Sequence, residues 1–459
     1  MANFTDSSVI ATGFNPGVVS AAQDRTLQRT FRDALYPRQL YRMEAVAELW
    51  PVNLGQNQTF TRTALIQPTT QPLLPGTDPV PSQYGVEQWE CTAQPWGGAI
   101  DTEMPTSYVT LASQYLRNNH QLGCHAGQSM NRVVRDKLFN NYVSGNTVTT
   151  GSGTSATVTV ANLAGLCFTI PAAGGRPTAV SATNPLQVTI NLAAGAVTAN
   201  ITTATPAVAG DYIHAGSITL DQTITWLGRE AVLAVNRARL LYSGGGTRVD
   251  DVASSDQFRM ADIRAAVAQM RFDNVPPFED GTYHCHLDPI SESQIFGDNE
   301  FQRLNQSIPD YIHYRRFALA FLAGCTFYRN TEAPTTATVS ENPQFGHTTA
   351  FELTNPTGVT LHRPIFLGQG CVEEKYLDQS RLISDAGVQG KIGEFAVVNG
   401  GMQILTERIR LILRAPLNRL QTVTGSAWSF FGDFGVPTDA LSLSSPANFK
   451  RAAIVVHGS

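Results

Sequence analysis

The feature that most constrains the fold of this chain is an uninterrupted helical pattern between residues 107 and 143. Pro105, Thr106 and Ser107 form a typical helix start, and nothing breaks the pattern before Ser144-Gly145. About 37 helical residues would form a rod of roughly 55 Å. Gly123 and Gly127 weaken a helix interior, so we expect a close packing contact there. Apolar residues recur mostly at spacings of three or four: Leu111, Tyr115, Leu122, Ala126, Met130, Val133 and Leu138.

The segment before this helix, residues 52–105, holds seven prolines and no lysine. Gln58 to Gln67 and Tyr84 to Ala93 have strand-like compositions, and the prolines between them disfavour helix. We therefore expect a long two-stranded arm. An isolated hairpin is only marginally stable, so this arm needs something to lie on.

Residues 144–220 change composition sharply, because only Arg176 and Asp211 are charged among them. Alternating runs at residues 156–160 and 187–190 predict strands. The alternative is a disordered low-complexity linker. The alternation and the apolar content favour a small β-rich domain inserted into the chain.

The remaining segments predict mixed helix and strand without a regular βαβ repeat, so the expected fold class is α+β. The predicted helices span Gln23–Leu35, residues 36–50, Gln222–Tyr242, Ala261–Phe272 and a segment from Ser291 onward. The predicted strands are Tyr283–Leu287, Leu361–Leu367, Gly393–Val398, Ile409–Leu413 and Ala452–Val456.

Composition narrows the functional classes. Charged residues make up 15% of the 459 residues, against about 25% in an average protein. Much of the surface is therefore either neutral or buried against other chains. The net charge of −5 excludes a strongly basic nucleic-acid binder. No apolar run approaches the roughly 18 residues of a membrane span, and residues 1–20 do not resemble a secretory signal. The six cysteines include no CxxC pair, so we expect free thiols.

Candidate chemical motifs are weak. The chain lacks the GxxxxGK[ST] phosphate loop, and the glycine run at residues 244–246 has no lysine after it. His284 and His286 would share one face of a strand, as metal ligands can. No HExxH motif and no second Cys/His pair supports them, so ordinary packed side chains are favoured. His120 and Cys124 share a helix face, but two ligands do not make a site.

Glu292, Asp298 and Glu300 could in principle form an acid/base pair. Glu292 is explained more simply as an acidic residue in the first turn of a helix. We therefore predict no enzyme activity, no cofactor and no metal site.

The order of elements resembles that of the major capsid proteins of tailed bacteriophages, which share the Hong Kong 97-type capsid fold. Local sequence also resembles the family at residues 261–263, Tyr283–Pro289 and Phe449–Val456. The resemblance covers most of the chain except residues 144–220. It implies an N-terminal arm at 1–51, an extended loop at 52–105, a peripheral domain with a spine helix at 106–143 and 221–256, an inserted β-rich domain at 144–220, and an axial domain with closing strands at 257–459.

The absence of lysine from residues 52–105 limits how such subunits could be joined to one another. Some family members form an isopeptide bond from a lysine on the extended loop, and residues 52–105 contain none. The chain has only four lysines beside 28 arginines: Lys137, Lys375, Lys391 and Lys450. We therefore expect non-covalent locking by arm overlap, apolar contacts and ion pairs. The expected assembly contacts are Arg62, Glu87, Trp89, Glu90, Asp250 and Asp251.

The function that the resemblance implies is self-assembly, as hexamers and pentamers, into an icosahedral phage head that encloses double-stranded DNA. The expected location is the virion, after assembly in the host cytoplasm. The DNA would be held only by weak contacts. Scaffolding, portal and decoration proteins are possible partners, and no membrane is implied. Two alternatives stay open: another virion protein of the tail or baseplate with an adhesive β-module, and a β-rich hydrolase.

Overall fold

The computed structural model divides the chain into two compact units, and each is described by itself. Unit 1 comprises Met1–Gln58, Glu90–Val134 and Glu373–Gly435, and unit 2 comprises Thr59–Trp89, Arg135–Val372 and Val436–Ser459. The structure describes residues 29–35, 37, 39–50, 55–63, 68–70, 72, 76, 78–79, 86–109, 114–169, 178–209, 215–228, 230–235, 237, 240–246, 251–305, 321–333, 359–377, 395–398, 401–406, 408–413, 422–437 and 451–459.

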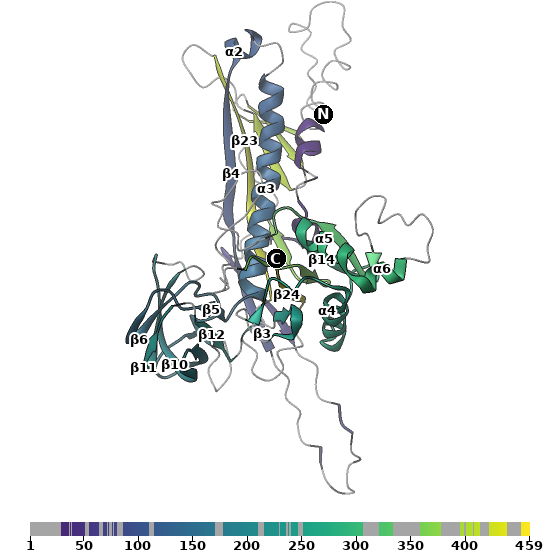
Figure 1. Ribbon diagram of the computed structural model, residues 1–459. Coiled ribbons are helices and arrows are strands. Elements are labelled where there is room, and N and C mark those ends of the chain that lie inside the picture. The colour runs from purple at the N-terminus through teal and green to yellow at the C-terminus, as the bar shows by residue number, and fades with distance from the viewer. Residues whose placement is uncertain are drawn as a thin grey trace, which may run out of the picture. The chain divides into compact units, whose positions relative to one another are not determined.

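The predicted long helix is confirmed as α3, Gln114–Tyr142, preceded by the short helix α2, Met104–Val109. Residues 110–113, where the prediction was continuous, lie outside the described residues. Within unit 1, α3 runs beside a sheet (Figure 1) and buries Leu122, Ala126 and Met130 at a spacing of four. His125 also faces the sheet, and its Nδ1 accepts a hydrogen bond from the Trp428 indole N–H at 3.0 Å.

The close contact expected at a glycine of the long helix is present at Gly123. A Cβ added there would lie 2.7 Å from the carbonyl oxygen of Phe31 and 2.9 Å from the Cβ of Ala34. Phe31, Ala34 and Leu35 belong to the helix at residues 29–35 and are buried. Glycine at position 123 therefore lets the backbone of this N-terminal helix lie directly on α3.

Unit 1 contains a seven-stranded sheet in which β23 is the central strand. The whole of β4 pairs with one edge of β23, over Val423–Gly432. The other edge of β23 pairs first with β22 and then with β19. The sequence did not predict β4, because it lies within the segment assigned to the extended loop and finds its partner more than 300 residues later. The strands are β1 Val46–Leu49, β4 Gln94–Glu103, β19 Glu373–Tyr376, β20 Phe395–Val398, β21 Gly401–Thr406, β22 Ile409–Leu413 and β23 Val423–Gly435.

The helix predicted at residues 36–50 was wrong. Arg42–Glu44 forms a single 3-10 turn, and β1 then joins the sheet in parallel with β19. The Arg42 guanidinium donates two hydrogen bonds, of 2.6 and 3.1 Å, to the carboxylate of Glu374 on β19. Both side chains are buried, and Arg408 Nη1 lies 3.5 Å from the same carboxylate. A partner so far along the chain overrides a local helical pattern.

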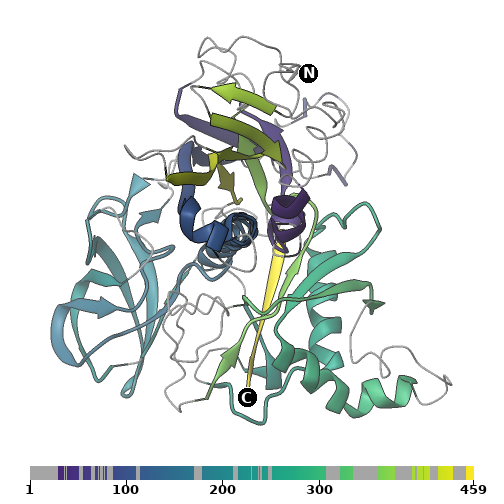
Figure 2. The ribbon, with the colours of Figure 1, turned by 90° about the horizontal axis from the view of Figure 1, so that it is seen from above.

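Unit 2 contains a second seven-stranded sheet, in which β24 lies between β13 and β18. Helices α4 and α5 lie beside this sheet (Figure 2, green, with β24 in yellow). The predicted strand 361–367 is interrupted near Pro364, and both of its parts pair with β24. The elements are β13 Leu240–Tyr242, α4 Met260–Phe272, β14 Tyr283–Leu287, α5 Pro289–Gly297, α6 Asn299–Asn305, β15 Phe321–Leu322, β16 Cys325–Arg329, β17 Leu361–His362, β18 Ile365–Leu367 and β24 Ala452–Gly458.

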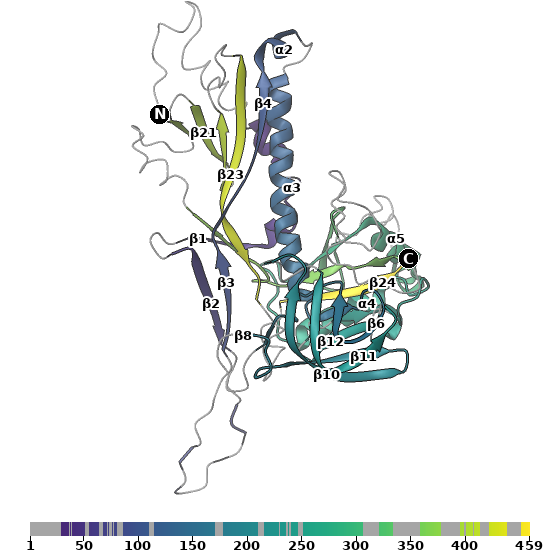
Figure 3. The same cartoon turned by 90° about the vertical axis from the view of Figure 1, so that its left-hand side faces the viewer.

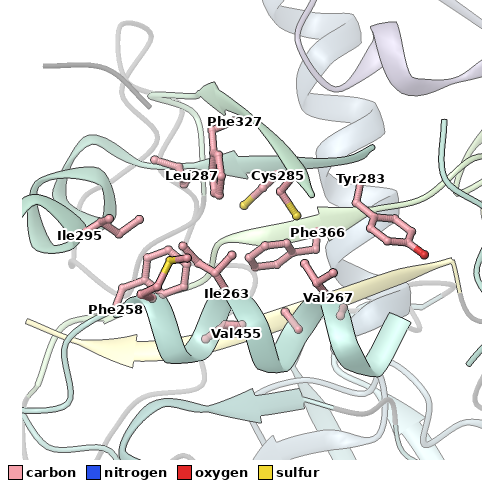
Figure 4. Close-up of a cluster of buried hydrophobic side chains, with 14 of the residues drawn as sticks. Phe258, Ile263, Val267, Tyr283, Cys285, Leu287, Ile295, Phe327, Phe366 and Val455 are labelled. Atoms are coloured by element: carbon pink, nitrogen blue, oxygen red, sulfur yellow. The ribbon is translucent and has the colours of Figure 1, made fainter. Parts of the chain in front are cut away.

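The core of this sheet is a cluster of buried side chains that join α4 to β14, β18 and β24. Ile263 and Val267 of α4 face Cys285, Phe366 and Val455 of the strands (Figure 4). The described cysteines of the chain are free thiols and all are buried, as expected for small apolar core residues. Burial raises the pKa of the Cys285 thiol well above its ordinary value.

A third sheet of six strands, also in unit 2, confirms that the charge-poor segment is folded β-structure (Figure 3). Its core is built from alternating side chains such as Val158, Val188, Ile190 and Ile218. A separate pair, β7 Phe168–Thr169 and β8 Thr178–Ala179, lies within the same segment of sequence. The six strands are β5 Asn146–Val148, β6 Gly153–Val160, β9 Leu186–Leu192, β10 Gly195–Pro206, β11 Gly216–Trp226 and β12 Ala231–Ala234.

The helix predicted at Gln222–Tyr242 was wrong, since this stretch holds the end of β11, β12 and β13. Leu227, which began the predicted apolar stripe, is exposed, whereas Ala231 and Ala234 are buried. Gly228 has φ of +96°, so the chain turns there between two strands. Because β12 pairs with β5 and β9, the six-stranded sheet extends past residue 220.

Among the described helices, none is both long and apolar enough to cross a membrane.

The contact at Gly123 should not tolerate a side chain. We expect Gly123→Val to lower the free energy of unfolding by about 1–3 kcal/mol, because the new side chain overpacks against the Phe31 carbonyl. Chemical denaturation of the unassembled subunit measures this. Gly297→Val is the control, because a Cβ at Gly297 meets nothing within 4 Å. Equal effects of the two substitutions would contradict the assigned contact.

The Arg42–Glu374 pair should be costly to break but replaceable as a pair. Arg42→Leu leaves a buried carboxylate and should lower the free energy of unfolding by about 3 kcal/mol, and adding Glu374→Leu should restore at least half of it. Arg29→Leu is the control, since the Arg29–Asp33 pair is exposed at 77% and 60% and such pairs contribute at most about 1 kcal/mol. A double variant no more stable than Arg42→Leu would argue against a buried pair.

Candidate assembly surfaces

The two strands predicted at Gln58–Gln67 and Tyr84–Ala93 are present as a two-stranded sheet of β2, Asn57–Thr63, and β3, Val86–Thr92 (Figure 3). Phe60 of β2 stacks on Trp89 of β3 with ring centroids 5.6 Å apart and planes 13° from parallel. This stack gives a sheet of only two strands a cross-strand contact of the kind that stabilises hairpins.

The predicted assembly residues divide into those that the structure describes and those that it does not. Trp89 is buried at 4% exposure by its packing on Phe60 and other residues of the subunit. Asp251 is exposed. The side chains of the rest lie outside the described residues: Arg62, Glu87, Glu90 and Asp250.

Two exposed apolar groups were missed by sequence reasoning. Tyr108 and Val109 at the end of α2 are 80% and 88% exposed. The second group lies at β1, the end strand of its sheet. Val46 and Leu49 of β1 and Met43 in the turn before it are exposed. The exposure of α2 could not be read from the sequence, because Tyr108 and Val109 continue the apolar pattern of the long helix.

One of the four lysines is engaged inside unit 1. The Lys375 ammonium donates a hydrogen bond to the Glu48 carboxylate and is itself buried, so β1 and β19 are joined by this pair as well as by their ladder.

The glycine-rich loop predicted at Ser243–Asp256 begins with an ordered turn, Ser243–Gly245, in which Gly244 has φ of +79°. The Ser243 hydroxyl lies within hydrogen-bond distance of the Gln257 carbonyl and the Asp262 carboxylate. A Cβ at Gly244 would meet the Asp256 carboxylate at 2.5 Å. Carboxylates beside the glycines repel an anion, which argues against a phosphate-binding loop here.

The histidines on β14 are packed into their surroundings. His284 stacks on Phe278 with centroids 4.0 Å apart, and its Nε2 lies 3.2 Å from Asp280 Oδ2. His286 is fully buried and stacks on Tyr328. Burial acts to raise the pKa of Asp280, but hydrogen bonds from Thr282 and His284 hold it below its ordinary value. Within the described ranges, no three His, Cys, Asp or Glu side chains are grouped so that they could hold a metal ion.

The candidate acid/base carboxylates each have a structural partner. Glu292 accepts a hydrogen bond of 2.6 Å from Arg329 Nε, and Glu300 lies 2.8 Å from Arg264 Nη1. The Asp298 carboxylate accepts the Met260 backbone N–H at 2.8 Å, at the start of α4. The His120 and Cys124 pair on α3 is 3.8 Å apart from Nδ1 to Sγ.

The outer face of the six-stranded sheet presents hydroxyl groups in place of charge. Thr154 and Thr225 lie opposite each other with their hydroxyls 3.0 Å apart, and Thr157 and Thr219 repeat the pairing at 3.4 Å. Hydrogen bonds from the backbone and side chain of Asn200 lower the pKa of the exposed Asp221 carboxyl. This sheet accounts for part of the low charge of the whole chain.

No family model matches the chain, and no curated protein matches it. Solved structures of phage capsids are similar over most of its length. The chain is 9% identical to the cyanophage Pam1 capsid, with 100% of this chain and 99% of that chain covered and a TM-score of 0.49. The Ralstonia phage GP4 capsid is 12% identical, with 91% and 87% covered and a TM-score of 0.45. For the Helicobacter pylori bacteriophage KHP30 capsid the identity is 9%, the coverage 90% and 88%, and the TM-score 0.44.

Proposed function

We propose that this chain is a major capsid protein, many copies of which assemble into an icosahedral phage head around double-stranded DNA. The observation that carries the proposal is the order of elements. The two-stranded loop β2–β3, the long helix α3 and the two α+β units with late closing strands follow the order of the Hong Kong 97-type capsid fold. The predicted α+β class and the element order agree with the structure.

The exposed features of the chain support a role in a multi-subunit structure. A two-stranded sheet has little core of its own and gains stability when it lies on another surface. The apolar pair Tyr108 and Val109 is exposed in the subunit, and burial of such side chains favours association. Many modest contacts per subunit would together hold a closed shell.

The proposed organisation follows the sequence analysis with one altered boundary. We retain an N-terminal arm at 1–51, an extended loop at 52–105, a spine helix at 106–143 and an axial domain with closing strands from residue 257. The inserted domain would run from β5 through β12, because both strands belong to its sheet. This insertion would stabilise the subunit or decorate the shell.

Five of the six predicted contact residues remain proposed intersubunit contacts: Arg62, Glu87, Glu90, Asp250 and Asp251. Trp89 is buried and stacks on Phe60, so it would support such contacts by stiffening the β2–β3 sheet. The shell would form in the host cytoplasm from hexamers and pentamers, with scaffolding, portal and decoration proteins as further partners. The net charge of −5 fits a shell that contains DNA by weak contact. No observation on the described residues favours the tail, baseplate or hydrolase alternatives.

Assembly itself tests the proposal. We expect the protein, expressed alone or with its neighbouring genes, to form closed shells or flat hexameric and pentameric capsomers in negative-stain micrographs. Tubes or fibres would support the tail or baseplate alternative. A monodisperse small oligomer with hydrolytic activity would support the enzyme.

A variant pair sharpens this experiment. Tyr108→Ser with Val109→Ser should reduce shell formation at least about tenfold at equal protein concentration, since about 1.4 kcal/mol lost per contact is a tenfold change. Val208→Ser, at a position 67% exposed in the bend after β10, is the control and should assemble normally. Equal assembly of the two variants would remove the α2 pair from the proposed contacts.

Non-covalent locking is a separate expectation. Because residues 52–105 contain no lysine, particles boiled in SDS should run as one band at the mass of the subunit. A ladder of linked subunits would show that another side chain forms covalent cross-links.

A further inference from the structure

Four buried polar side chains meet in unit 2 where α5, β17 and β24 come together. Asp288 precedes α5 as its N-cap, Ser291 lies in the first turn of α5, His362 ends β17 and His457 lies near the end of β24. Their exposed fractions are 5%, 0%, 1% and 0%. We call these four residues the β24 lock.

Asp288 is the acceptor at one end of the lock. Its carboxylate accepts the backbone N–H groups of Ile290 at 3.2 Å and Ser291 at 3.4 Å, as an N-cap does. It also accepts the Ser291 hydroxyl proton. His362 Nδ1 lies 2.9 Å from Asp288 Oδ2. A carboxylate with these neighbours is satisfied only in its ionised form.

The network assigns a proton on one of the two imidazole rings. The Ser291 hydroxyl donates its one hydrogen to a hydrogen bond with Asp288. The Ser291 oxygen must therefore accept a hydrogen bond from His457 Nε2, which lies 2.7 Å away. The Ser291 contact therefore places a proton on Nε2 of His457. The Nδ1 atom of His457 lies 3.5 Å from the Gly458 carbonyl, at the limit of a hydrogen bond, and burial disfavours a second proton there. His362 Nδ1 lies 2.9 Å from Asp288 Oδ2, and its Nε2 lies 2.9 Å from the Ser459 hydroxyl.

The ring stacking disfavours a positive charge on His457. His362 and His457 stack with centroids 5.1 Å apart, and Phe258 covers the other face of His457 at 5.2 Å. A charged His457 would thus sit between an aromatic ring and another imidazole, at a position closed to solvent. Two imidazolium rings at this separation would also repel each other.

The other charged groups on the packed elements have partners elsewhere. On α5, Glu292 pairs with Arg329. In the segment before α4, the Asp256 carboxylate accepts the Ala253 N–H, while its backbone carbonyl accepts the Gly458 N–H. Arg363, which follows His362, is buried and has further contacts in the subunit. Among the carboxylates named here, Asp288 is the one whose charge acts on both imidazoles.

The pKa shifts of the lock follow from this geometry. Burial, then the neighbouring His362, lowers the pKa of His457 to about 3, although Asp288 acts in the other direction. Burial acts to raise the pKa of Asp288, but the hydrogen bond and charge of His362 and the Ser291 hydroxyl outweigh it and bring the pKa to about 2.

Both shifts give stability at neutral pH that acid removes. The unfolded chain binds a proton at His457 near the ordinary histidine pKa of 6.5, while the folded chain does not. The stabilisation is therefore fully present above 6.5 and falls progressively toward 3. The contribution of Asp288 is lost at still lower pH, between the ordinary aspartate pKa of 3.8 and about 2.

We propose that the β24 lock is an acid-sensitive device, which fastens β17 and the end of β24 to α5 at neutral pH and releases them on acidification. The released strand matters because β24 pairs with β13, β17 and β18 and so holds its sheet together. This inference is independent of shell formation, because it concerns the fold of one subunit.

Hydrogen exchange of the full-length unassembled subunit tests the lock. Rates are compared at about pH 7.5 and about pH 5 after correction for the intrinsic pH dependence of exchange. Protection of residues 452–458 should fall at least about tenfold more than protection of β22, because one His with this shift contributes more than a factor of ten between these pH values. Equal changes in the two strands would overturn the proposal.

A variant pair assigns the effect to the lock. His457→Gln keeps an N–H donor for Ser291 but cannot titrate, so protection of β24 should become nearly independent of pH. His120→Gln, on the exposed side of α3, should keep the wild-type response. A His457→Gln variant that retains the wild-type response would overturn the proposal.

If His457→Gln does not fold, an NMR titration of the wild-type protein tests the lock instead. Among the nine histidines, at least one ring signal in an NMR titration should have its midpoint below about pH 5. Nine midpoints that all lie within about one unit of 6.5, the ordinary spread of folded proteins, would overturn the lock.

Discussion

The constraint on which the rest of unit 1 depends is the pairing of β23 along both of its edges. Its Val423–Gly432 stretch pairs with β4 on one edge, and the other edge pairs with β22 and β19. The backbone groups of a central strand must all be paired, because an unpaired buried N–H or C=O is costly. β1, β4, β19 and β22 are therefore held in one sheet by β23, and the part of α3 in unit 1 has a surface on which to pack.

The same logic explains the buried charges. Arg42 lies in the turn before β1, and Glu374 lies on β19; this sheet brings the two segments together. Their two hydrogen bonds support the parallel register of β1 on β19. In unit 2, Asp288, Ser291, His362 and His457 fasten another late strand in the same manner. Each unit thus uses a buried polar cluster where segments distant in sequence meet.

The proposed assembly role depends on what the folded units leave exposed. The β2–β3 sheet is two strands wide, α2 ends in exposed Tyr108 and Val109, and the inserted sheet presents threonine hydroxyls. Each feature is ordinary alone. Together they are the features on which the proposed assembly rests.

The sequence by itself determined the elements that local patterns specify: α3, the β2–β3 strands, the alternating strands of the insertion, α4, β14 and β22. It also determined the lack of lysine in residues 52–105. That residues 46–49, 231–234 and 240–242 form strands depends on tertiary pairing, because their partners are far away in sequence and override a helical spacing. Likewise, His362 and His457 are 95 positions apart, and only the pairing of β17 with β24 brings their rings together.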